Sequence, residues 1–342
     1  MSGDGPAVLH LVIPGLLDRV REWQSDYGDV GRYPSLEWLL GRAQVQMQGA
    51  AGMEATLAEL FGFPGALPGA ALRRLALTGE AHTGRWLCMD PVHLEAGVTD
   101  LVLSGPDMLC LDSREAQALV DRINAHLAGE GLAIEATRPD QWHLCLPEGT
   151  AVPDTVALSR VLGRPVNASL PGGGQSRYWH QLINELQMLL FDAPENHARE
   201  ARGLPTVNSV WPWGGGALPE SVHAPVTRMY ADDPIVSGLG RLAGVPVEPL
   251  PDAAEAVLQT RGPRLVWLDM LWEDVVRDDP EAWGGGLDGL ERAWFMPLRR
   301  ALRGPRLSAL HVYTAFGPVF EVSAAACWRF WRRPRPLREC LP

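Results

Sequence analysis

The chain has 342 residues, of which 46% are hydrophobic and 21% charged, and its formal net charge is −11 at pH 7. This length allows one or two domains with large cores, and the composition is that of an ordinary globular protein. The acidic balance argues against general nucleic-acid binding, because a phosphate backbone requires a basic protein face. All 30 basic residues are arginine, which excludes a Schiff-base lysine, a pyridoxal phosphate anchor and a P-loop.

The cysteines and the apolar runs bear on the compartment. The five cysteines are scattered and form no CxxC pair (Cys88, Cys110, Cys145, Cys327 and Cys340). Such an odd count predicts reduced thiols in a cytoplasmic protein. The first apolar run is too short for the core of a signal peptide, and no run has the length of a membrane span, so we expect neither.

The first elements in chain order belong to an α/β pattern and then to an inserted domain. An apolar run at 7–13, ended by Pro14 and Gly15, predicts a buried parallel strand. Short helices are expected at 35–40 and 54–61, and Ser113 is expected to cap a helix that runs to about residue 129. Strands around that helix are expected at 84–94, 100–104, 133–135 and 141–146. This order predicts an α+β insertion at 81–170 inside a core made of 1–80 and 171–342.

The last part of the chain returns to alternating helices and strands. Residues 179–191 form an amphipathic pattern, with leucines on one face of the expected helix. Further helices are expected from 232 to about 244 and at 287–302. In the second of these, Pro297 interrupts the helical pattern and is expected to kink the helix. Strands are expected at 264–268, 307–313 and 319–322. The alternation predicts a doubly wound α/β sheet with a small α+β insertion.

The most distinctive stretch is 192–216, DAPENHAREARGLPTVNSVWPWGGG. Its composition is poor for core formation and suited to holding a polar ligand, although an irregular surface loop with tryptophan anchors is the alternative. Arginine grips phosphate or carboxylate groups with two hydrogen bonds, so the expected ligand is a phosphorylated or carboxylated metabolite. The candidate ligand contacts are Asn196, Arg199, Arg202, Asn208, Trp211, Trp213, Gly214, Gly215 and Gly216.

The same stretch resembles the segment HPxNxxR…GxPxxNxxWxWGxG of the archaeal-type cofactor-independent phosphoglycerate mutases, which belong to the alkaline phosphatase superfamily. The matching residues are Pro194, Asn196, Arg199, Gly203, Pro205, Asn208, Trp211, Trp213, Gly214 and Gly216. A looser likeness runs through nearly the whole chain and is closest to a bacterial branch of mutase-like or regulatory proteins that lacks the metal ligands. The resemblance implies an alkaline-phosphatase-like α/β fold.

Mutases of this family use two divalent metals, such as Mn or Zn, to activate a serine or threonine that accepts the phosphoryl group. The resemblance places the first metal ligand, an aspartate, after the first strand, where HLVIPGLLDRV has Pro14 instead. The nucleophile would lie in GMEATLAELFGFPG, where Met53 takes the place of the serine and Thr56 is the nearest hydroxyl. A late Asp-His pair corresponds to Ala315 and Phe316.

Some carboxylates remain as weak metal candidates. Asp269 matches an Asp-xxx-His element, but Glu273 stands where the histidine would be. Asp18 survives from the tail of the first motif. Because these carboxylates do not make a binuclear site, we expect no family-type metal centre. If the chain is active, Asp18, Asp269 and Glu273 would be relocated ligands of two divalent metals.

Two other features of the sequence are candidates for function. Asp90 and His93 follow a strand and could act together as a catalytic pair, although a satisfied structural pair is the simpler interpretation. The basic, aromatic run Cys327–Arg338 (CWRFWRRPRPLR) could contact an acidic partner, a nucleic acid strand or a membrane surface. The simpler interpretation is a terminal segment that docks its tryptophans and leaves its arginines in solvent.

The leading hypothesis is a degenerate mutase-like protein, a pseudoenzyme that binds a metabolite or acts in regulation. The first alternative is an active phosphoglycerate mutase-like isomerase or phosphatase that uses Thr56 and relocated metal ligands. The second is a structural protein that docks a partner chain through its tryptophans and its basic C-terminal segment.

Overall fold

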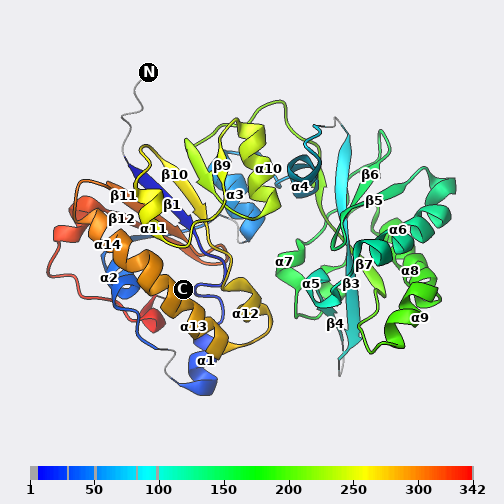
Figure 1. The fold of residues 1–342 in the computed structure, drawn as a ribbon, viewed down its shortest axis with the longest axis horizontal. Coiled ribbons are helices and arrows are strands. Elements are labelled where there is room, and N and C mark those ends of the chain that lie inside the picture. The colour runs from blue at the N-terminus through cyan, green and yellow to red at the C-terminus, as the bar shows by residue number, and fades with distance from the viewer. Residues whose placement is uncertain (1–6, 29–30, 50–51, 82–83, 98–99, 341–342) are drawn as a thin grey trace. The chain divides into compact units, whose positions relative to one another are not determined.

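The computed structural model describes residues 7–28, 31–49, 52–81, 84–97 and 100–340 (Figure 1). The chain divides into two compact units. The core unit consists of the residues up to Gly62 and those from Val222 onward, and the inserted unit runs from Phe63 to Ser221. None of the helices in the described ranges combines the length and the apolar character needed to cross a membrane.

The core unit is built on one sheet with the strand order β2-β12-β11-β1-β10-β8-β9. Strands β11, β1, β10, β8 and β9 are parallel, and β12 and β2 extend the sheet in antiparallel pairing. The strands are β1 (Val8–Val12), β2 (Gln44–Met47), β8 (Arg228–Tyr230), β9 (Val247–Glu248), β10 (Arg264–Trp267), β11 (Ala309–Tyr313) and β12 (Pro318–Ser323).

Helices cover both faces of this sheet, as the alternating pattern predicted. Leu9 and Leu11 of β1 project into the main core with α2, α13 and α14. On the opposite face α10 comes so close that a Cβ on Gly240 would lie 3.4 Å from the sulfur of Met229 in β8. The helices are α1 (Val20–Tyr27), α2 (Pro34–Arg42), α3 (Met53–Phe61), α10 (Pro234–Ala243), α11 (Ala254–Leu258), α12 (Trp272–Val276), α13 (Pro280–Leu290) and α14 (Met296–Leu302), with 3₁₀ turns η4 (Ala324–Trp328) and η5 (Leu337–Glu339).

The irregularity expected at Pro297 is a π-helical segment within the helix. The predicted helix 287–302 is a continuous run in which a π-helical segment, η3 (Glu291–Phe295), separates α13 from α14. Pro297 lies in the first turn of α14, directly after the π segment. A proline cannot donate an intrahelical hydrogen bond, and the wider π turn accommodates the interruption without ending the helix.

The inserted unit contains a second sheet with the order β4-β3-β6-β5, and β7 pairs with the other edge of β3. Helices α6 and α8 pack their apolar faces on this sheet around Leu87 and Met89 of β3. The strands are β3 (Arg85–Ala96), β4 (Leu101–Ser104), β5 (Ala133–Arg138), β6 (Gln141–Leu146) and β7 (Ser209–Gly216). The helices are α4 (Gly69–Thr78), α5 (Pro106–Leu109), α6 (Ser113–Leu127), α7 (Leu158–Val161), α8 (Ser176–Phe191) and α9 (Pro194–Glu200), with 3₁₀ turns η1 (Ala128–Glu130) and η2 (Asn167–Ser169).

Two details differ from the sequence expectations. The predicted insertion at 81–170 lies within the inserted unit, which is longer at both ends because α4 packs beside β3 and β7 pairs with it. The cap of α6 is Asp112 and not Ser113, since the Asp112 carboxylate accepts hydrogen bonds from the backbone N–H groups of Arg114 and Glu115. The Glu115 side chain returns to the Asp112 N–H, which completes a capping box.

Candidate functional site

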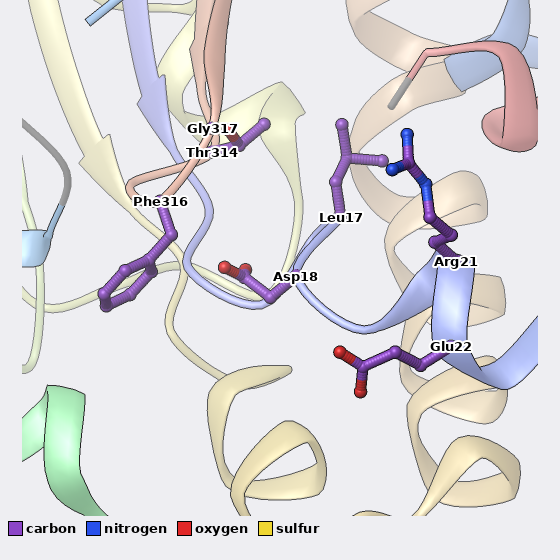
Figure 2. A pocket seen from close by; sticks show the side chains of 7 residues that line it. All are labelled: Leu17, Asp18, Arg21, Glu22, Thr314, Phe316 and Gly317. Carbon is purple, nitrogen blue, oxygen red and sulfur yellow. The ribbon is translucent and has the colours of Figure 1, made fainter. Parts of the chain in front are cut away.

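A small cavity lies at the carboxyl edge of the core-unit sheet, where β1 ends between β11 and β10. Its volume is about 210 Å³, and Figure 2 shows the side chains around it. They come from the loop after β1, from α1 and from the loop after β11: Leu17, Asp18, Arg21, Glu22, Thr314, Phe316 and Gly317. Ligands of doubly wound sheets bind outside the carboxyl ends of the strands, so the fold itself favours this place.

Hydrogen bonds to protein groups hold the charged side chains of the cavity. The Asp18 carboxylate accepts a hydrogen bond from the backbone N–H of Gly15 at 2.9 Å, which closes the turn after β1. The Arg19 Nε donates to Glu22 at 2.7 Å. Arg21 supplies the guanidinium group of the cavity lining. Two carboxylates and one lining guanidinium therefore surround a space that suits a small, polar ligand.

The residues that the resemblance assigns to the metal positions, Pro14, Ala315 and Phe316, do not fit a metal. The ring of Phe316 stacks on Trp272 of α12, with centroids 4.9 Å apart and planes inclined by 10°. Ala315 is buried, adopts a left-handed backbone conformation (φ 62°) and accepts a hydrogen bond from Gly52 at 2.7 Å through its carbonyl. Neither these residues nor Pro14 offers a side-chain donor atom. Among the described residues, no group of three or more His, Cys, Asp or Glu side chains is arranged to hold a metal ion.

Thr56, the weak candidate for a nucleophile, lies in the first turn of α3 and is buried. Its hydroxyl donates to the carbonyl of Gly52 at 2.8 Å and lies 3.2 Å from the amide nitrogen of Gln48. Among the described residues, the hydrogen-bond partners of this hydroxyl are a backbone carbonyl and the Gln48 side chain, neither of which is a general base, so the geometry does not activate Thr56.

The other metal candidates, Asp269 and Glu273, have separate surroundings. Trp267 Nε1 donates to the Asp269 carboxylate at 3.2 Å. Neighbouring protein atoms displace water from that carboxylate and raise its pKa, although part of the side chain stays exposed. Glu273 forms an ion pair with Arg277 one turn along α12 and is half exposed. These are surface interactions of a loop and a helix.

The stretch 192–216 forms α9 and β7 and contributes to the core of the inserted unit, so the expectation of a poor core-former is wrong. Buried Asn196 donates to the carbonyls of Leu190 and Val207 at 2.7 and 2.8 Å and accepts from the N–H of Val207 at 2.9 Å. These bonds tie the end of α8 to the segment that enters β7.

Arg199 is fully buried, and three protein groups surround its guanidinium. It donates to the Pro205 carbonyl and to Glu115 of α6, both at 2.8 Å, and to the Leu109 carbonyl. Arg202 donates to the same Glu115 carboxylate at 3.0 Å, and its side chain is 53% exposed. Of these two arginines, Arg202 is therefore the one that a dissolved ligand can reach.

The remaining residues of the motif also contact protein groups. The Asn208 side chain bonds both the N–H and the C=O of Leu94, at 2.7 and 2.9 Å, and so holds the end of β3. The indoles of Trp211 and Trp213 donate to the Val156 carbonyl and to Asp90. A Cβ on any of the three glycines would approach protein atoms, the closest being Val152 at 2.3 Å from Gly215 (Gly214, Gly215 and Gly216). The role of these residues as ligand contacts stays a prediction.

Asp90 and His93 are not brought together, because residues three apart in β3 project from opposite faces. Asp90 forms a buried, bidentate ion pair with Arg73 of α4, at 2.6 and 2.8 Å. Arg73 also donates to His143 Nε2 at 3.0 Å. Burial, followed by the positive charges of Arg73 and Arg74, lowers the pKa of His143 to about 2. His93 Nδ1 donates separately to the Thr206 carbonyl at 2.7 Å.

Sequence comparison finds a weak, partial similarity to a mutase. No family model matches the chain. Over 140 residues, 40% of its length, the chain is 26% identical to the 2,3-bisphosphoglycerate-independent phosphoglycerate mutase of Methanosarcina barkeri. The chain is a weak homologue of the archaeal-type cofactor-independent phosphoglycerate mutases. The match spans 34% of that relative, about a third of its length.

Structure comparison supports the fold. The PH0037 protein of Pyrococcus horikoshii superposes with a TM-score of 0.55 at 13% identity, over 93% of this chain and 88% of that protein. The mixed α/β fold expected from the resemblance is thereby confirmed at the level of overall architecture. The cofactor-independent phosphoglycerate mutase of Thermoplasma acidophilum matches with a TM-score of 0.40 at 16% identity, over 93% and 90% of the two chains.

Proposed function

We propose that this mutase homologue has no binuclear metal catalysis and acts by binding a small phosphorylated or carboxylated metabolite, in a regulatory role. One observation carries the proposal. At the carboxyl edge of the core-unit sheet, the positions that the resemblance assigns to metal ligands hold Pro14, Ala315 and Phe316, and the Phe316 ring is engaged with Trp272. A site refilled with apolar groups does not provide the donors that a binuclear centre requires.

The cavity at this edge is the binding site that the geometry favours. Its volume of about 210 Å³ is below the range of about 300–1,000 Å³ typical for drug-sized ligands, so the ligand is a small metabolite. Arg21 is the guanidinium of the cavity lining and supplies the positive group for an anion. The nearby carboxylate of Asp18 favours one carboxylate or phosphate group over several.

The stretch 192–216 is the second place proposed for the ligand. Its accessible cation is Arg202, and an anionic ligand there must compete with Glu115 for the guanidinium. Binding at the cavity requires Arg21, and binding at the stretch 192–216 requires Arg202. Substitution of each arginine in turn therefore distinguishes the two sites.

The first experiment measures divalent metal by elemental mass spectrometry after dialysis of the purified protein against trace Mn and Zn. We expect far less than one metal per chain and no interconversion of 2- and 3-phosphoglycerate in a coupled assay. About two metals per chain, with phosphoryl transfer that chelation abolishes, would establish the alternative of an active enzyme with relocated ligands.

The second experiment measures binding by calorimetry, with 3-phosphoglycerate, glycerate and inorganic phosphate as probes. We expect binding of at least one probe, weakened roughly tenfold or more by Arg21→Ala, as for loss of one charge-assisted hydrogen bond. Arg202→Ala is the matched control. Loss of binding in Arg202→Ala alone would move the site to the inserted unit, and no binding of any probe would reject the metabolite proposal.

A further inference from the structure

An exposed aromatic and basic segment follows the last strand of the core unit. All eight residues of Trp328–Arg335, here called the strap, are exposed. The exposed fractions of Trp328, Phe330 and Trp331 are 75%, 86% and 66%. Large aromatic side chains seldom stay this exposed unless they serve an interaction surface. The expectation that this terminal segment buries its tryptophans is therefore wrong for Trp328 and Trp331.

The strap is fixed to the core unit at several points. Arg332 Nη1 donates to the Ala43 carbonyl at 3.1 Å, and the N–H of Arg335 donates to the Glu37 carbonyl at 3.0 Å. Beyond it, Leu337 and Cys340 are buried in the main core. A Cβ on Gly41 of α2 would lie only 2.4 Å from the Arg333 carbonyl, so the backbone of the strap lies directly on this helix. The aromatic rings are thus displayed by an ordered segment.

The strap concentrates positive charge in an acidic chain. It contains four arginines, and none of them forms an ion pair with another described residue (Arg329, Arg332, Arg333 and Arg335). Next to it, the guanidinium groups of Arg42 and Arg299 lie over the same Trp38 ring, at 4.2 and 4.8 Å from its centroid. Like charges held this close are stabilised when an anion joins them.

A recess lies between the strap and the end of α2. Its volume is about 460 Å³, and its lining is Gly41, Ala43, Arg332, Arg333, Pro334, Arg335 and Glu339. Between the lining residues Gly41 and Ala43, buried Arg42 leaves its Nε without a hydrogen-bond partner. Burial lowers the pKa of Arg42. The nearby Cys327 partly opposes this shift, and the positive charges of Arg299 and Arg303 lower the pKa further.

We propose that the strap and this recess form a docking site for an acidic protein segment, a function separate from metabolite binding. Glutamate or aspartate side chains of the partner enter the recess and pair with Arg332, Arg333 and Arg335. An apolar partner side chain packs on Trp328, Phe330 and Trp331, the residue types enriched at interface hot spots.

Three features favour this partner over other acidic surfaces. A recess accepts projecting side chains, which the flat surface of a bilayer does not present. The net charge of −11 opposes the approach of a nucleic acid, which presents charge along its whole length. A protein segment needs only local charge complementarity, because screening at physiological salt limits charge effects to about 8 Å.

The test uses the full-length protein and fluorescence anisotropy. The probe is a labelled 12-residue peptide of alternating Glu and Leu pairs, and its counterpart carries Gln at every Glu position. The binding-site variant combines Arg332→Gln, Arg333→Gln and Arg335→Gln. The matched control combines Arg114→Gln, Arg138→Gln and Arg164→Gln, which removes the same charge from exposed positions of the inserted unit. A third variant replaces Trp328, Phe330 and Trp331 by serine.

We expect the Glu peptide to bind the wild-type protein and the control equally, and the Gln peptide to bind neither. Affinity should fall about tenfold in the strap arginine variant and by at least as much in the aromatic variant, with unchanged circular dichroism melts. Equal binding by the wild type and both strap variants overturns the proposal. So does strap-dependent binding of phosphatidylserine vesicles or of single-stranded DNA without peptide binding, or a strap-dependent dimer in sedimentation that the peptide does not dissociate.

Discussion

The carboxyl edge of the core-unit sheet and the stretch 192–216 of the inserted unit differ in how they relate to the mutase pattern. At the edge, the positions that the resemblance assigns to polar metal ligands hold Pro14, Ala315 and Phe316. In the inserted unit, the polar residues of the pattern are present. The side chains of Asn196 and Arg199 donate hydrogen bonds to backbone carbonyls and, for Arg199, to a carboxylate of the protein.

This difference shows that the residues of a sequence motif can stabilise a fold without taking part in catalysis or ligand binding. The side chains of Asn196, Arg199 and Asn208 each bridge elements that are separate in sequence, so the architecture of the inserted unit suffices to explain their presence. The edge has no comparable constraint, because an aromatic stack and an apolar loop there are compatible with an intact sheet.

The largest expected effect tests the inserted unit. Arg199→Ala leaves the Pro205 and Leu109 carbonyls inside the protein without their partner and leaves the partly buried Glu115 carboxylate with Arg202 alone as its guanidinium partner, so we expect a loss of roughly 3–5 kcal/mol in the free energy of unfolding. Arg202→Ala is the matched control, because it removes the exposed partner of the same carboxylate and should cost at most about 1 kcal/mol. Urea denaturation followed by tryptophan fluorescence measures both.

The opposite pattern would break the comparison. If Arg199→Ala unfolds at the wild-type urea concentration and instead loses metabolite binding, the stretch is a ligand site and not a scaffold.

Acid should weaken the inserted unit through His143. Its Nε2 accepts from Arg73, so the ring is neutral in the folded state and its pKa is lowered to about 2. The unfolded chain takes up a proton near pH 6.5. Because the unfolded state binds more protons below that pH, stability falls as pH drops from 6.5, by up to about 1.4 kcal/mol per pH unit.

The measurement is the urea midpoint at pH 7.5, 6.5, 5.5 and 5.0. His143→Gln should flatten the dependence of the inserted-unit transition. His126→Gln, which changes an exposed histidine of α6, should leave it intact. An equally steep decline in His143→Gln would mean that other groups carry the acid sensitivity. Burial, followed by the charge of His311, lowers the pKa of His10 in β1 to about 4. The stability of the core unit should therefore also fall as the pH drops below 6.5.

Much of the sheet could be predicted from sequence, because its strands are short, apolar runs. Val8–Val12 and Arg264–Trp267 lie as expected, and the pattern also located the helices at Ser113–Leu127 and Ser176–Phe191. The signals in these segments are local, since they depend on the periodicity of apolar residues within one element.

The elements that sequence analysis missed depend on distant partners. Helix α4 buries Arg73 and Arg74, which interrupts the apolar pattern, and their partners Asp90 and Glu135 lie on two different strands. Strand β7 contains Pro212 and three glycines, which disfavour a strand, and forms because β3 offers it a full edge.

The candidate site was only partly predictable. The position of Asp18 after the first strand was visible in the sequence, and Asp18 does line the cavity. The stacking of Phe316 on Trp272 joins the loop after β11 to helix α12, 44 residues apart in the chain, and no local sequence pattern indicates such a contact. The strap differs again, since its composition was conspicuous but only the structure shows that its aromatic side chains are exposed.

A smaller effect tests the refilled edge. Phe316→Ala removes the stack on Trp272, and we expect a loss of about 1–2 kcal/mol in the free energy of unfolding of the core unit. Trp272→Phe keeps an aromatic partner and should cost less than about 1 kcal/mol. Thermal melts of both variants measure this. If Phe316→Ala costs nothing, the ring does not stabilise the edge, and the contrast between the two regions loses its physical basis.

The smallest expected effect has the opposite sign. Ala315 adopts φ 62°, a conformation that costs a non-glycine residue about 1 kcal/mol or more. Ala315→Gly relieves this strain at the edge, although glycine also raises the entropy of the unfolded chain, so we expect a net gain of roughly 0.5 kcal/mol. The same change at Ala193, which is buried with φ −71°, should destabilise the protein and serves as the control. A clear loss of stability in Ala315→Gly would show that the Cβ of Ala315 packs well enough to outweigh its strain. In that case the apolar refilling of this edge stabilises the fold by itself.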